Sequence, residues 1–298
     1  MIKTIGLTKK FGEKKALNDV NLVVNDGAIY GLVGSNGSGK STLMRLISGV
    51  YYADAGVVSV DNETPYNNAL LKAKVSYLPD TPFFIHQSNI NEMASFYKKM
   101  YPSFSIERFE KLSKTFPLDR KARISTMSKG MQRQAALMLC LSTMPKYLLL
   151  DEAFDGLDPV MRKVLKSLLA EGVSDGMTAI IASHNLRDLD ELCDNVGLLH
   201  EGKLLVNDSI DAIKNGIHKF QVVFNTVPDL SVFENLDILK IERSGSVVNL
   251  AARGEKKEIS NFINGLFPLF VEAIPPSFEE VFMYELEAMN YDAENLFE

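Results

Sequence analysis

The sequence lacks several features that would place it in other classes of protein. Its longest apolar runs, such as "AALMLCLS", fall far short of the roughly 18 residues that a membrane span needs. The start, "MIKTIGLTKKFG", has no apolar segment and no cleavage site, so we expect no secretory signal. The formal net charge of −6 argues against a nucleic-acid partner, which would require a basic face. If this protein works at a membrane, another chain must do the spanning.

Cysteine is also scarce, and no repeat or low-complexity tract is present. Cys140 and Cys193 both lie among apolar, helix-like residues, which favours reduced core thiols in a cytosolic setting over a disulfide. The overall composition is that of an ordinary globular protein, with 46% hydrophobic and 23% charged residues. A length of 298 residues allows one large domain or two smaller ones with a sizeable core.

Strand and helix patterns alternate over residues 1–215. The strand patterns are "LNDVNLVV", "AIYGLVG", "KVSYLP", "YLLLD" and "TAIIASH". A helix is predicted from about Lys40 to Ser48, and residues 83–144 form a helical insert with polar faces and few β-branched runs. Alternating strands and helices predict an α/β fold with a mostly parallel sheet.

The pattern changes around Asn215–Lys219. Beyond it, "FQVVFN", "ILKIERSG", "SVVNLAARG" and "PLFVEAI" read as strands, with helices over Glu255–Leu266 and from Ser277. A hairpin is predicted at Ser244-Gly245. We therefore expect a small C-terminal α+β domain over residues 220–290, followed by an acidic tail, 291–298, that frays.

The strongest motif is "GLVGSNGSGKST". From Gly34 it matches G-x-x-x-x-G-K-[ST] after a predicted strand and before a predicted helix, the context that identifies a phosphate-binding loop and hence a P-loop NTPase core. Glycines let consecutive N–H groups point at phosphate oxygens, while Lys40 reaches the β- and γ-phosphates and Ser41 offers its hydroxyl to Mg²⁺. The nucleotide-binding residues assigned here are Gly34, Ser35, Asn36, Gly37, Ser38, Gly39, Lys40, Ser41 and Thr42.

Polar residues follow two later strand patterns. In "YLLLDEAF", Asp151 suits Mg²⁺ coordination through water, and Glu152 suits orienting and deprotonating an attacking water. His184 closes "IIASH" and should reach the same carboxyl edge of the sheet, where an imidazole could approach a γ-phosphate. We assign catalysis to Lys40, Glu152 and His184, and expect His86, His200 and His218 to be core or surface residues.

Together these residues resemble a family, the ATP-binding cassette (ABC) ATPases. "GSNGSGKST", "MSKGM", "LLLDEAF", "GLDP" and "SH" occur in the family's order and spacing over about residues 1–215. The resemblance implies a nucleotide-binding core with a helical subdomain, working as a head-to-tail dimer with ATP and Mg²⁺. It implies that Phe11 stacks on adenine and that Asp158 bridges two protomers.

The segment "MSKGM" stands where the family has leucine-serine-glycine-glycine-glutamine. Ser128 is a good N-cap and Gly130 lies in the first helical turn, where glycine costs about 1 kcal/mol against alanine. A bare helix N-terminus is an anion site, and by resemblance Ser128 and the N–H of Gly130 hold a γ-phosphate bound by the opposite protomer. Lys129 either adds a favourable charge there or is a solvated first-turn lysine.

Asp80, in "SYLPDTPFF", departs from the family's glutamine, a Mg²⁺ contact that also senses the membrane partner. We include Asp80 among the expected metal residues with Ser41 and Asp151, although aspartate is shorter and charged; the alternative is that Asp80 caps a turn before Thr81-Pro82.

By this resemblance we expect the ATP-binding and ATP-hydrolysing subunit of an ABC transporter, which powers a separate integral-membrane permease of the export type. It would lie in the cytoplasm, peripheral on the cell membrane, as a homodimer or heterodimer with a second cassette. The alternatives are a soluble ABC ATPase that acts away from transport and a regulatory cassette that binds ATP without hydrolysis. A single phosphate loop argues against the first, and Glu152 with His184 argues against the second.

Overall fold

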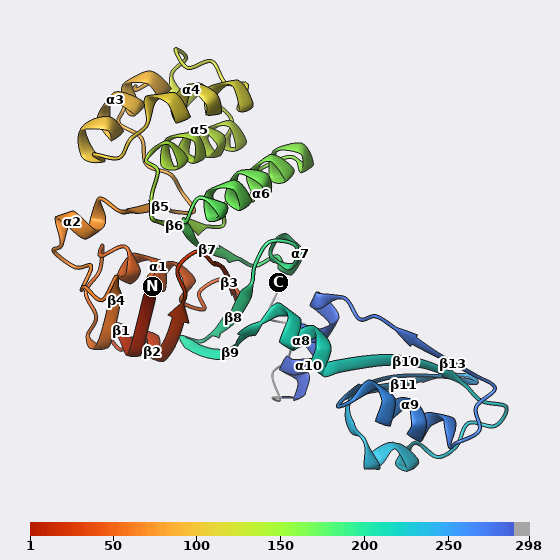
Figure 1. Ribbon diagram of the computed structural model, residues 1–298. Helices are drawn as coiled ribbons and strands as arrows, with labels where there is room; N and C mark the ends of the chain where they lie inside the picture. Colours follow the sequence, from red (N-terminus) through yellow and green to blue (C-terminus); the bar gives the residue numbers. More distant parts are fainter. Residues whose placement is uncertain (289–298) are drawn as a thin grey trace. The chain divides into compact units, whose positions relative to one another are not determined.

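The computed structural model describes residues 1–288, which form two compact units (Figure 1). The first spans Met1–Asn207 and the second begins at Asp208, earlier than the boundary expected at residue 215. The difference arises because helix α8 (Ile210–Gly216) contacts helix α10 (Phe278–Ala288) in the second unit. The tail over 291–298, predicted to fray, lies outside the described residues.

A six-stranded sheet forms the centre of the first unit, in the order β5-β6-β7-β3-β8-β9. Its first five strands pair in parallel, as the alternating pattern predicted. Strands β3, β6 and β7 are buried along their whole length, as expected where helices cover both faces of a parallel sheet. The strands are β5 (Val75–Leu78), β6 (Tyr147–Asp151), β7 (Thr178–Ser183), β3 (Ile29–Val33), β8 (Asn195–His200) and β9 (Lys203–Ser209).

A separate antiparallel sheet, in the order β2-β1-β4, packs on the first. Only β2 (Lys14–Val24) was anticipated; β1 (Ile2–Phe11) and β4 (Ala55–Val60) were missed. Lysines and threonines interrupt the apolar residues of β1, so its strand character emerges only when Ile2 pairs with both Val24 and Val60. One hydrophobic core joins this sheet to the parallel sheet and to helix α1 (Lys40–Ile47).

The predicted helical insert contains three main helices, which lie together in Figure 1. They are α3 (Ile90–Met100), α4 (Ile106–Thr115) and α5 (Lys129–Ser142). Side-chain caps explain where they begin: Asn89 forms a capping box with Glu92, Ser105 caps α4, and Ser128 caps α5. The first unit also contains α6 (Pro159–Ser174), which is longer than these three, and the short helices α2 (Ala69–Lys72), η1 (Ile124–Thr126) and α7 (Leu186–Asp190).

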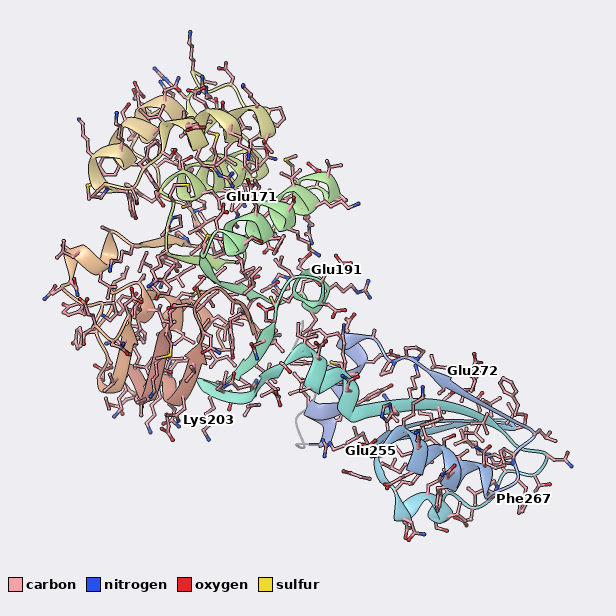
Figure 2. All side chains as sticks on the ribbon, viewed as in Figure 1. Glu171, Glu191, Lys203, Glu255, Phe267 and Glu272 are labelled. Carbon is pink, nitrogen blue, oxygen red and sulfur yellow. The ribbon has the colours of Figure 1, made fainter. Side chains whose placement is uncertain are left out.

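An ion-pair cluster ties α4 to α6. Arg108 donates two hydrogen bonds to Glu171, at 3.0 and 3.1 Å, and Lys111 adds a third at 2.8 Å. Figure 2 labels Glu171 on α6. The Arg108 guanidinium, followed by the Lys111 ammonium, lowers the pKa of Glu171 to about 2. The cluster thus links the helical subdomain to a helix that packs on the parallel sheet.

Replacing Glu171 with Gln should lower the melting temperature by about 1–3 °C at pH 7, because solvent screening limits such a pair to about 1 kcal/mol or less. A depressed folded-state pKa stabilises the protein above the unfolded-state pKa, near 4.5, and that stability is lost as the pH falls towards 2. The difference between wild type and variant should therefore shrink below about pH 4.5 in urea unfolding. Glu191→Gln, which breaks the single, more exposed pair with Lys166, is the control and should change little. A loss of stability in Glu171→Gln that does not change with pH would contradict the claim that the ion pairs lower the pKa of Glu171.

The second unit is a four-stranded antiparallel sheet, in the order β11-β12-β10-β13, with helix α9 (Lys256–Asn264) packed on one face. The predicted hairpin is present, since β11 (Asp237–Ser244) and β12 (Val247–Arg253) pair around the turn. The remaining strands are β10 (Ile217–Val223) and β13 (Phe270–Ile274), and η2 (Leu230–Asn235) precedes β11. The small α+β fold predicted for this region is confirmed.

Within residues 1–288, no helix has both the length and the apolar character needed to cross a membrane.

Candidate functional site

The predicted phosphate-binding loop joins the buried strand β3 to helix α1. Gly39 is the N-cap of α1 with a φ of +115°, and a Cβ there would lie 2.6 Å from the backbone oxygen of Ala16. Only glycine fits such a left-handed, crowded position. The first turn of α1 has neither a side-chain cap nor an acidic residue, so its N–H groups remain available to an anion.

Lys40 folds back over this loop. Its Nζ donates to the backbone oxygens of Gly34, at 2.6 Å, and Ser35, at 3.1 Å, and lies 3.4 Å from Oε1 of Glu152. The side chain is almost fully buried, so the ammonium depends on these oxygens to offset its desolvation. Phosphate oxygens are acceptors that could take their place.

A cavity of about 310 Å³ opens beside the loop. It gathers most of the predicted site residues from distant parts of the sequence, and its lining consists of Phe11, Lys14, Ala16, Ser35, Asn36, Gly37, Gly39, Lys40, Ser41, Thr42, Asp80 and Glu152. Phe11 is 47% exposed at the end of β1, edge-on to Tyr51, which places its ring at the cavity and not in the core. Gly34, Ser38 and Asp151 are buried and do not line the cavity.

The carboxyl end of β6 carries Asp151 and Glu152, both buried. Oδ1 of Asp151 and Oε1 of Glu152 accept no hydrogen bond from the described residues. Tyr77 donates to Oδ2 of Asp151 at 3.3 Å, and burial, together with the charge of Asp151, raises the pKa of Tyr77 so that it stays a donor. Oε1 of Glu152 still has its ion pair with Lys40, whereas the buried Oδ1 of Asp151, next to a hydroxyl-bearing loop, fits a Mg²⁺ ion held directly or through water.

Glu152 adopts a left-handed backbone conformation, with a φ of +49°. Such strain in a non-glycine residue is frequent at functional sites, where surrounding contacts hold it. Here the N–H of Glu152 donates to the backbone oxygen of Ala182, the penultimate residue of β7. This backbone contact fixes the position of Glu152 at the carboxyl edge of the sheet.

His184 meets Glu152 at this edge because β6 and β7 are parallel neighbours. Nδ1 of His184 lies 3.0 Å from Oε2 of Glu152, and the His184 backbone N–H donates to the same oxygen at 3.3 Å. The imidazole is 43% exposed, so it can still contact a ligand. The predicted convergence of these two residues is therefore present in the fold.

Ser128 and Gly130 do not line the cavity that holds Lys40. Oγ of Ser128 accepts from the N–H of Met131 at 3.2 Å, which leaves its own proton free to donate. Gly130 has a local explanation that the sequence did not reveal: a Cβ there would lie 2.5 Å from the backbone oxygen of Gly156, in the loop after Glu152. The glycine at position 130 thus permits close packing within the chain.

Asp80 takes part in a contact that sequence reasoning missed. Its Oδ1 accepts from Nη2 of Arg133 at 3.1 Å, and Nη1 of Arg133 donates to the backbone oxygen of Asp151 at 3.3 Å. Arg133 is buried on α5, whereas the Asp80 side chain is 59% exposed. Both charges are visible in the sequence, but nothing in their spacing indicates that they meet.

A second cavity, of about 260 Å³, lies at the other end of the parallel strands, where Pro145 and Met177 precede β6 and β7. Its lining is largely apolar, including Leu141 and Leu168. None of the predicted site residues lines this second cavity, so the first cavity is the candidate site.

Comparison with known proteins yields one family. A model of the ABC transporter family matches residues 17–155. The ABC transporter ATP-binding protein YtrB of Bacillus subtilis (strain 168) is 28% identical over 95% of this chain and 97% of its own length. The bacitracin transport ATP-binding protein BcrA of Enterococcus faecalis is 30% identical over 74% of this chain and 73% of its own.

Among solved structures, the ATP-binding cassette MJ0796, described as a dimer in a post-hydrolysis state bound to ADP and phosphate, is similar in fold. Its TM-score is 0.63 at 21% identity, over 70% of this chain and 98% of that one.

Proposed function

Because this chain belongs to the ATP-binding proteins of ABC transporters, we propose that it uses ATP binding and hydrolysis to drive a separate membrane permease in export. The observation that carries the proposal is the cavity that brings the phosphate-binding loop, Phe11 and Glu152 together. ATP binding would close a dimer of cassettes, and hydrolysis would reopen it. Nod factor export, which a relative from Bradyrhizobium diazoefficiens carries in its name at 28% identity over 95% of each chain, supports export over uptake.

In this proposal the loop N–H groups and Lys40 bind the β- and γ-phosphates of ATP. Ser41 and Asp151 would hold Mg²⁺, which neutralises charge on the phosphates. Glu152 is the general base that deprotonates the attacking water, and His184, oriented by its 3.0 Å contact with Glu152, contacts the γ-phosphate. Ser128 and the N–H of Gly130 face the nucleotide of the opposite protomer, which accounts for their position outside the cavity.

Replacing Phe11 with Ala should raise the Michaelis constant for ATP about fivefold or more, with little change in the maximal rate. Stacking on adenine is equal in the ground and transition states, so its loss, worth about 1–3 kcal/mol, is a uniform loss of binding. Steady-state ATPase kinetics measure both constants. Phe267→Ala removes a 90% exposed ring of the second unit and serves as the control. An unchanged Michaelis constant would show that Phe11 makes no contact with the base.

GTP should also be a tolerable substrate, because stacking contacts the face of the base and makes no hydrogen bond to its edge.

The partner is the integral-membrane permease, and the cassette would act at the cytoplasmic face of the cell membrane beside it. The test is to purify a tagged chain from native membranes in mild detergent and identify what accompanies it by mass spectrometry. We expect an integral-membrane protein in stoichiometric amount, absent when an unrelated tagged cytosolic protein is used. Recovery of the chain with ribosomes, and without a membrane protein, would favour the soluble alternative.

A further inference from the structure

The guanidinium of Arg133 joins three parts of the first unit. Arg133 projects from the second turn of α5, the helix capped by Ser128. It donates to Asp80, in the loop after β5, and to the backbone oxygen of Asp151, at the end of β6. Because Arg133 is only 9% exposed, an arginine in this place needs acceptors of this kind to offset its desolvation.

Asp80 would be a harmful charge in this cavity without Arg133. It lines the same cavity as Lys40 and Ser41, where the proposed function places a triphosphate. Glu152 already brings one carboxylate to this lining. A second, unpaired carboxylate would repel the phosphates, since like charges within about 10 Å interact appreciably at the effective dielectric of a protein surface.

We propose that Arg133 is a positioning residue that neutralises Asp80 and holds its carboxylate away from the nucleotide. Asp80 then connects the loop after β5 to α5 and does not ligate Mg²⁺. The inference rests on the proposed nucleotide site. Its consequence is mechanical, because the same guanidinium holds α5, which presents Ser128 to the partner, against the strand that carries Asp151.

Equilibrium binding of a fluorescently labelled ATP, with Mg²⁺ and separately with EDTA, tests the proposal. Arg133→Gln frees the Asp80 charge and should raise the dissociation constant about tenfold in both conditions. Asp80→Asn should bind as tightly as wild type or more tightly in both. The double variant should return to within about twofold of wild type, because removing the carboxylate removes the repulsion that the first change exposed.

Three other results would overturn the proposal. If Asp80→Asn binds ATP more weakly than wild type only when Mg²⁺ is present, Asp80 is a metal ligand. This single variant answers that question even if Arg133→Gln does not fold. If adding Asp80→Asn fails to restore ATP binding to the Arg133→Gln protein, and the melting temperature of that protein is lowered, the role of Arg133 is purely structural. Arg133→Lys binding as poorly as Arg133→Gln would exclude charge neutralisation.

Lys40→Ala is the reference variant for the nucleotide site itself, and exposed Lys257→Ala on α9 is its matched control. If Lys40→Ala weakens binding but Arg133→Gln does not, only the present inference fails. If neither weakens binding while the nucleotide still binds, the proposed function of this cavity fails.

Discussion

Replacing Glu152 with Gln is expected to reduce ATP hydrolysis by about 10²–10⁴-fold while ATP binding persists. Glutamine keeps the size of the side chain and an oxygen, but it cannot accept the proton of the attacking water. The change leaves Lys40 and the loop, the proposed phosphate contacts, in place, so we expect the γ-phosphate to stay bound. Single-turnover hydrolysis and equilibrium ATP binding, measured on the same preparation, separate the two effects.

The same variant should accumulate a dimer in ATP, because closure without hydrolysis has no route to reopening. Gel filtration with and without ATP measures this. Glu171→Gln makes the same chemical change in a pair between α4 and α6, and should hydrolyse ATP within about twofold of wild type. Turnover by Glu152→Gln at the wild-type rate would mean that another carboxylate is the base.

Mixing two inactive variants is expected to restore activity if each site is shared between two chains. Lys40→Ala disables both phosphate loops of a homodimer, and Ser128→Arg places a long cationic side chain at the start of both α5 helices. A hybrid dimer has one site with both defects and one site with none. Random pairing makes about half the dimers hybrid, so an equal mixture should recover about a quarter of wild-type activity when one intact site suffices.

Ser128→Asp is a second variant of this N-cap for the same mixture, because aspartate keeps a capping side chain for α5 while placing an anion against the phosphate. It should also be rescued by Lys40→Ala, which shows that rescue does not depend on a distorted helix. The specific activity of wild type should rise with protein concentration where the dimer is dilute. No rescue in either mixture, with activity independent of concentration, would contradict the shared site.

Local chemistry accounts for the parts that the sequence predicted. The phosphate-binding loop follows from its glycines, Lys40 and Ser41 placed between a buried strand and a helix. Glu152 and His184 could be placed together because the carboxyl ends of parallel strands share an edge. The hairpin of the second unit follows from its turn residues. The loop and the hairpin depend on patterns within one short segment, and the meeting of Glu152 with His184 depends on two such strand patterns and the rule that parallel strands share an edge.

By itself, the sequence determined the α/β class, the phosphate-binding loop, the carboxylates behind it and the helix that begins at Ser128. Only the tertiary structure decided that β1 and β4 form a second sheet, that Gly130 packs against the Gly156 oxygen, and that Arg133 meets Asp80. The physical reason is that these contacts join residues far apart in the chain, and neither a glycine nor a charge carries any local mark of its distant partner. Their energies arise from close approach and from burial, which exist only once the sheet has brought the segments together.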